Sequence, residues 1–114
     1  MDRINYAGES FLTGSAIARA LLDYAQALAE VGSSGTADIP TVDVNGREGS
    51  VTVLVGPASQ LISATIDSDH PEPADEGLVE QLHTRAADLR TQGATTARPQ
   101  VPESPPSDDR SDFI

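Results

Sequence analysis

The chain has 114 residues, and its 18 carboxylates against 7 arginines give a formal net charge of −11 and an isoelectric point near 4.2. It contains no cysteine and no lysine, which excludes thiol nucleophiles, disulfides, cysteine metal sites and lysine Schiff-base chemistry. A charge this negative repels phosphate backbones and anionic lipid, so we expect no nucleic-acid and no membrane partner. We expect a cytoplasmic protein, since no stretch approaches the roughly 18 apolar residues of a membrane span and no leader is evident.

The composition changes near Asp67. Residues 1–66 hold 21 large apolar side chains and residues 67–114 only seven, while six of the eight prolines follow His70. Low hydrophobicity combined with charge and proline is typical of disordered segments. We therefore expect four segments, namely a small α+β domain at 1–66, an acidic linker at 67–75, an amphipathic helix at 76–92 and a disordered acidic tail at 93–114.

The first elements along the chain are a short hairpin and a helix. Polar and apolar residues alternate over 3–6, turn residues follow, and Phe11 begins a second apolar stretch, which predicts the hairpin. Helix-start residues around Ser15 precede apolar residues at helical spacing as far as Val31. The sequence therefore predicts a helix over 15–31, ended by the glycines and serines of 32–35.

This predicted helix has two adjacent apolar stripes. The stripe expected to face the sheet consists of Ile17, Leu21, Tyr24, Leu28 and Val31. The second stripe consists of Ala18, Leu22, Ala25 and Ala29. Together they form an apolar arc wider than one sheet face covers. We therefore predict that the second stripe is an interaction face, covered by the C-terminal helix folding back, by a second copy of the chain or by another protein.

Three further strands are predicted after a loop. Valines alternate with polar residues on both sides of a turn at Asn45-Gly46, which predicts a second hairpin. These valines are Val42, Val44, Val51, Val53 and Val55. Pro40 is expected at a strand start or edge because it lacks an amide hydrogen. The last strand is expected to place Ile62 and Ile66 on one face.

The predicted order is β-β-α-β-β-β. Short connections favour antiparallel pairing everywhere except across the helix, so we predict an α+β fold in which one helix packs on a small, mostly antiparallel sheet. This arrangement resembles a ubiquitin-like roll in the order of its elements only. In the second part of the chain, apolar residues recur at helical spacing between a cap at Asp75 and a stop at Gly93. A helix of this length with one narrow stripe is marginal alone, so we expect it to form mainly when docked.

No set of residues converges on a catalytic or metal site. The acidic run from Asp67 to Glu76 places Pro71 and Glu72 where a calcium loop needs a ligand and a glycine, so it is interpreted as a solvated linker. His70 and His83 show no fixed partners in sequence, and we expect Arg19 and Asp23 to form only an exposed pair within the helix. We predict no catalytic residue, no cofactor and no metal.

The leading hypothesis is a non-enzymatic protein–protein interaction or accessory module that binds a protein partner, or a second copy, through helix 15–31. A first alternative is a toxin-neutralising or inhibitory protein whose acidic tail masks a basic site, with disorder becoming order on binding. A second alternative is a small enzyme of unrecognised type, whose catalytic residues would converge only in the folded chain.

Overall fold

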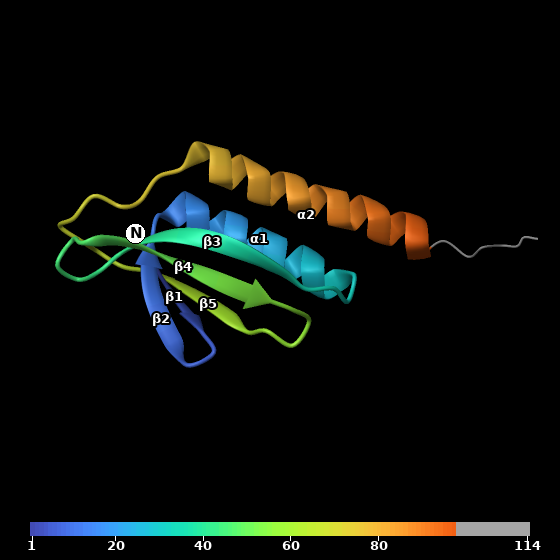
Figure 1. Cartoon of the computed structure of the whole chain (residues 1–114), viewed down its shortest axis with the longest axis horizontal. Coiled ribbons are helices and arrows are strands. Elements are labelled where there is room, and N and C mark those ends of the chain that lie inside the picture. Colours follow the sequence, from blue (N-terminus) through green and yellow to red (C-terminus); the bar gives the residue numbers. More distant parts are fainter. Residues whose placement is uncertain (98–114) are drawn as a thin grey trace, which may run out of the picture.

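A computed structural model of the chain describes the backbone of residues 1–97 and the side chains of residues 1–93 (Figure 1). The expected order is confirmed, with a second helix at the end. The elements are β1 (Asp2–Tyr6), β2 (Glu9–Thr13), α1 (Ser15–Glu30), β3 (Gly35–Val42), β4 (Glu48–Val55), β5 (Leu61–Thr65) and α2 (Glu76–Ala97). Most of the tail predicted at 93–114 lies outside the described residues.

The strands form one five-stranded sheet in the order β4-β3-β2-β1-β5, and every neighbouring pair is antiparallel. The fold is therefore α+β, as predicted. β1 pairs along its whole length with β2 and β5, and β3 does so with β4. β2 and β3 share a single residue pair in the ladder, Leu12 with Val42. From that point the β1–β2 and β3–β4 hairpins diverge (Figure 1). The sheet therefore has a three-stranded part, β2-β1-β5, which joins the β3–β4 hairpin at one end.

The β1–β2 turn is tight. The register places Tyr6 opposite Glu9, which leaves Ala7 and Gly8 as the only turn residues. Both have positive φ, 53° and 83°, as a type I′ turn requires. Glycine adopts this conformation freely, whereas alanine does so at a cost.

β3 begins at Gly35, earlier than the sequence predicts, and runs through Pro40. The amide of Asp43 donates to the carbonyl of Arg47, which sets the phase of the β3–β4 ladder. With this pattern, the backbone groups of Pro40 point away from β4 and toward the side of β2. The pairing between β2 and β3 has already ended there. Pro40 therefore needs no amide hydrogen, and its carbonyl accepts a bond of 2.8 Å from the hydroxyl of Thr13.

The turn of this second hairpin corrects one prediction. Val44, expected on the strand beside Val42, lies in the turn and is 79 % exposed. Asp43 accepts hydrogen bonds from the amides of Asn45 and Arg47, and Gly46 takes a φ of 84°. This side-chain capping favours a turn starting at Asp43 over two further strand residues.

α1 lies between the sheet and α2 (Figure 1). The stripe expected to face the sheet is buried at Ile17, Leu21, Tyr24 and Leu28, and these residues pack against Ile39 and Val55 of the β3–β4 hairpin. Gly35 is required at the start of β3, because a side chain there would collide with the Tyr24 hydroxyl. Leu82 and Ala86 of α2 are also fully buried, so α2 completes the same core.

α2 passes through Gly93 and ends at Ala97, whereas the sequence predicts an end at residue 92. A Cβ on Gly93 would lie 2.5 Å from Val31 Cγ1. The glycine therefore allows close approach of the two helices, and it does not act as a helix stop.

Candidate interaction surface

A groove of about 340 Å³ opens between the tip of the β1–β2 hairpin and β4. Its walls are mainly apolar and include Ile4, Tyr6, Phe11, Val51 and Val53. Glu9 is the one charged residue that lines it. The groove exists because β2 and β3 diverge after a single residue pair and α1 does not fill the end of the space between them. It is large enough to receive side chains of a partner, at the small end of ligand-site volumes.

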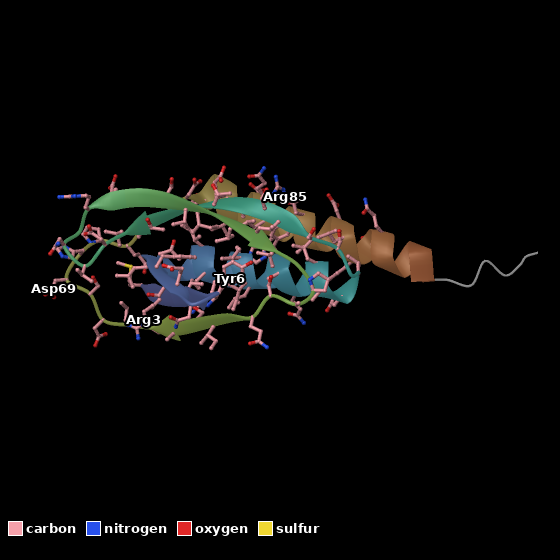
Figure 2. All side chains as sticks on the ribbon, turned by 60° about the horizontal axis from the view of Figure 1, so that its bottom comes forward. Arg3, Tyr6, Asp69 and Arg85 are labelled. Atoms are coloured by element: carbon pink, nitrogen blue, oxygen red, sulfur yellow. The ribbon has the colours of Figure 1, made fainter. Side chains whose placement is uncertain are left out.

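Tyr6 bounds this groove at one end. Its hydroxyl donates to the carbonyl of Leu54 and lies 3.3 Å from Ser59 Oγ. In Figure 2, Tyr6 lies at the centre of the view, between the ribbons of β4 and β5. Beyond it is a second, more open hollow of about 720 Å³, lined by the β4–β5 loop and Ile62. Tyr6 thus divides the space between the hairpins into two parts.

The outer edge of β4 forms one lip of the groove. The hydrogen bond between Asp43 and Arg47 fixes which residues of β4 bond to β3, because the bonded positions alternate along the strand. The backbone groups of the other residues point away from β3; these residues are Glu48, Ser50, Thr52 and Leu54. Tyr6 binds the carbonyl of Leu54. Within residues 1–97, no strand pairs with this edge, and the backbones of Ser50 and Thr52 have no partner there. The edge therefore presents free donors and acceptors.

Acidic side chains surround this edge. Asp38 lies opposite Thr52 in the β3–β4 register and accepts a hydrogen bond of 2.6 Å from its hydroxyl. Glu48 begins β4, and Glu9 lies at the groove. All of these carboxylates are exposed, so they create a negative potential along the strand.

The predicted stripe on α1 divides between core and surface. Ala18 is fully buried inside the chain and is unavailable to a partner, Leu22 and Ala25 are half-buried, and Ala29 is exposed. α2 covers the other flank of α1, where Asp23 contacts His83 and Arg90 and where Val31 approaches Gly93. An interface at Leu22, Ala25 and Ala29 stays a prediction.

Asp23 corrects the expected exposed pair with Arg19. Its carboxylate lies 2.8 Å from His83 Nδ1 and 2.7 Å from Arg90 Nη1, and Arg90 also binds Glu30 at 3.0 Å. Partial burial raises the pKa of Asp23, but the hydrogen bonds from His83 and Arg90 together outweigh it and hold the pKa below its usual value. The cluster joins α2 to α1, and no local sequence spacing could reveal it.

Asp2 was also missed by sequence reasoning. It is 7 % exposed and accepts hydrogen bonds from Ser15 at 2.7 Å and from Ser63 at 2.8 Å. Burial raises the pKa of Asp2, yet these bonds and the nearby N-terminal ammonium lower it overall. The carboxylate links β1, α1 and β5, and it lies away from the groove.

The acidic linker contacts the folded part of the chain. Pro73 lies against Gly14, His70 lies against Gly46, and Glu72 pairs with the N-terminal ammonium. Glycines occupy two of these contact points because a Cβ at either position would collide with the linker. Among residues 1–97, no group of three His, Asp or Glu side chains is arranged to hold a metal ion.

None of the helices described in residues 1–97 is both long and apolar enough to cross a membrane. No known protein family, curated protein or solved structure matches the chain. The resemblance to a ubiquitin-like roll therefore extends no further than the order of the elements.

Proposed function

We propose that this protein is a non-enzymatic module that binds another protein through the outer edge of β4 and the groove beside it. The observation that supports this most directly is the free backbone of Ser50 and Thr52 beside an apolar groove. Edge strands are usually protected by lysine, proline, a bulge or a covering segment. β4 has 8 residues, contains neither lysine nor proline, and pairs with no strand on its outer side within residues 1–97.

The backbone conformation of the hairpin tip also supports this surface. Ala7 is the one non-glycine residue with positive φ among residues 1–97, and it lies in the wall of the groove. Unfavourable backbone conformations persist where the surrounding structure imposes them, and they concentrate at functional sites. The α1 stripe has less support, because Ala18 is buried and Leu22 and Ala25 are half-buried.

The proposal includes a cytoplasmic location and no nucleic-acid or membrane partner. The net charge of −11 supports the exclusion of nucleic acid and anionic membranes, since it repels phosphate backbones and anionic lipid.

Site-specific photo-crosslinking in the native host tests the proposal. A photoreactive residue replaces Ser50 on the β4 edge, and in a matched control it replaces exposed Thr84 on α2. We expect one protein to crosslink at position 50 and not at position 84, and Thr52→Pro to abolish that crosslink. A crosslink that survives Thr52→Pro, or the absence of any partner at position 50, would overturn the proposal.

A further inference from the structure

We propose, resting on the interaction function above, that the partner supplies an extended segment that joins β4 as an additional strand. The segment alternates apolar side chains, which enter the groove, with basic side chains, which lie on the face of the sheet that carries Asp38. Three features of β4 support this occupant, namely its free backbone groups, the position of the groove and the surrounding charge.

The backbone groups define the mode of binding. Ser50 and Thr52 each direct one amide hydrogen and one carbonyl outward, at the spacing of alternate residues along the strand. An added strand matches that spacing, because every second residue of it directs one amide hydrogen and one carbonyl toward β4. A compact ligand does not repeat its donors and acceptors at this interval. Tyr6 already binds the carbonyl of Leu54, so the added strand pairs with the Glu48–Thr52 part of β4 and ends at Tyr6.

The pleat decides where each partner side chain points. The partner residue opposite Val51 shares its face, which is the inner face lined by Phe11 and Ile4. This partner side chain enters the groove and must be apolar. Partner residues opposite Ser50 and Thr52 point to the outer, solvated face.

The charge of the outer face selects basic side chains. A partner residue opposite Thr52 lies on the same face as Asp38, which is on β3 at the other side of β4 and whose carboxylate binds the Thr52 hydroxyl. A long side chain at that position extends over Thr52 toward this carboxylate. Lysine or arginine there gains attraction from Asp38 and from exposed Glu48.

The same charges disfavour a second copy of the chain as the occupant. Antiparallel self-pairing centred on Ser50 would place Glu48 of one copy opposite Thr52 of the other and near its Asp38. Like charges at such positions destabilise a sheet pair, and each chain carries a net charge of −11.

Binding of synthetic peptides to the purified full chain tests this inference. The probe is a short peptide of alternating valine and arginine, and fluorescence anisotropy is measured at physiological salt. One control peptide has the same sequence with N-methyl groups on the residues that face β4, which removes backbone donors and keeps the charge. A second control peptide alternates valine and glutamate. We expect the probe to bind, the N-methylated peptide to bind about tenfold or more weakly, and the glutamate peptide not to bind.

Variants of the protein complete the test. We expect Thr52→Pro to weaken probe binding at least about tenfold, because it removes an outward amide and leaves the β3–β4 ladder intact. Asp38→Asn should weaken it severalfold, whereas Asp88→Asn, an exposed residue on α2, should not. Circular dichroism checks that each variant folds, and the N-methylated peptide gives an answer with the unaltered protein.

Equal binding of the probe and its N-methylated form would overturn the inference, since it would show charge attraction without strand addition. Absence of probe binding, or a dimer of the purified chain that Thr52→Pro dissociates, would also overturn it. A Thr52-dependent crosslink at position 50 in the host, together with no peptide binding, would remove the strand inference and leave the proposed function standing.

Discussion

Arg90 of α2 and Asp23 of α1 form an ion pair in which Nη1 lies 2.7 Å from Oδ1. Arg90 also directs Nη2 to the backbone carbonyl of Asp23 at 3.4 Å and Nε to Glu30. One side chain therefore binds two carboxylates and the backbone of the neighbouring helix. Arg85, also on α2, donates a hydrogen bond to the carbonyl of Thr36 in β3 and lies over the ring of Tyr24 in α1. Polar contacts thus join α2 to α1 beside the buried apolar contacts of Leu82 and Ala86.

Removing the charge of Asp23 should loosen α2. We expect Asp23→Asn to lower the free energy of unfolding by about 1 kcal/mol, because the carboxylate is only partly screened and binds two side chains. Amide exchange in α2 should accelerate more than exchange in the sheet. Asp88→Asn, at an exposed position of α2, is the control, and equal effects of the two substitutions would contradict this role for Asp23.

Stability should decline in acid. The pKa values of Asp23 and Asp2 are lowered in the folded chain, so their contribution is complete above the ordinary carboxyl pKa of about 3.9 and is lost as pH falls through the lower folded values. We expect urea unfolding to show little loss between about pH 7 and pH 5 and a clear loss below about pH 4. The loss should be shallower in Asp23→Asn. An identical acid dependence in that variant would show that Asp23 does not contribute.

Relieving the turn at Ala7 should stabilise the protein. Asparagine tolerates a φ near 53° better than alanine does, and Asn-Gly is the preferred pair for a type I′ turn. We expect Ala7→Asn to raise the free energy of unfolding by about 0.5–1 kcal/mol, measured by urea denaturation. Gly8→Ala should act in the opposite direction, and destabilisation by both substitutions would argue against this turn geometry.

Shortening Leu82 should destabilise the whole fold. Leu82 is 1 % exposed and belongs to the core that α1 and the sheet share. We expect Leu82→Ala to cost about 2–4 kcal/mol in a single cooperative transition. Half-buried Leu78 is the control and should cost less when replaced by alanine. A change confined to α2, with the sheet unaffected, would mean that residues 1–66 are stable without it.

Leu22→Asp tests the predicted stripe on α1. Leu22 is half-buried while Leu21 is fully buried, so we expect the variant to fold and to lose any association made through the stripe. Circular dichroism reports the fold and light scattering reports the association. Unfolding would assign Leu22 to the core, and unchanged association in a folded variant would exclude the stripe as the interface.

The elements of this fold could be predicted because each depends on neighbouring residues. The spacing of Ile17, Leu21, Tyr24 and Leu28 determines both α1 and the face that it buries. The alternation of Val51, Val53 and Val55 after Asn45-Gly46 indicates β4 in the same way. Local steric and hydrogen-bonding preferences are sufficient for such patterns. Val44 was misplaced because the carboxylate of Asp43 caps the turn, a preference that competes with alternation.

The candidate site depends on residues that lie far apart in sequence. β2 and β3 pair only at Leu12 and Val42, and the two hairpins diverge beyond this pair. The groove beside β4 therefore remains open. Glycine ends helices in many sequences. Here Gly93 continues α2, and its missing side chain leaves room for Val31 of the neighbouring helix. Sequence by itself thus determined which segments become strands and helices, because those choices are local. Only the tertiary structure decided which strand edges remain unpaired and which flank of α1 receives α2, because both depend on the packing of segments that lie far apart in the sequence.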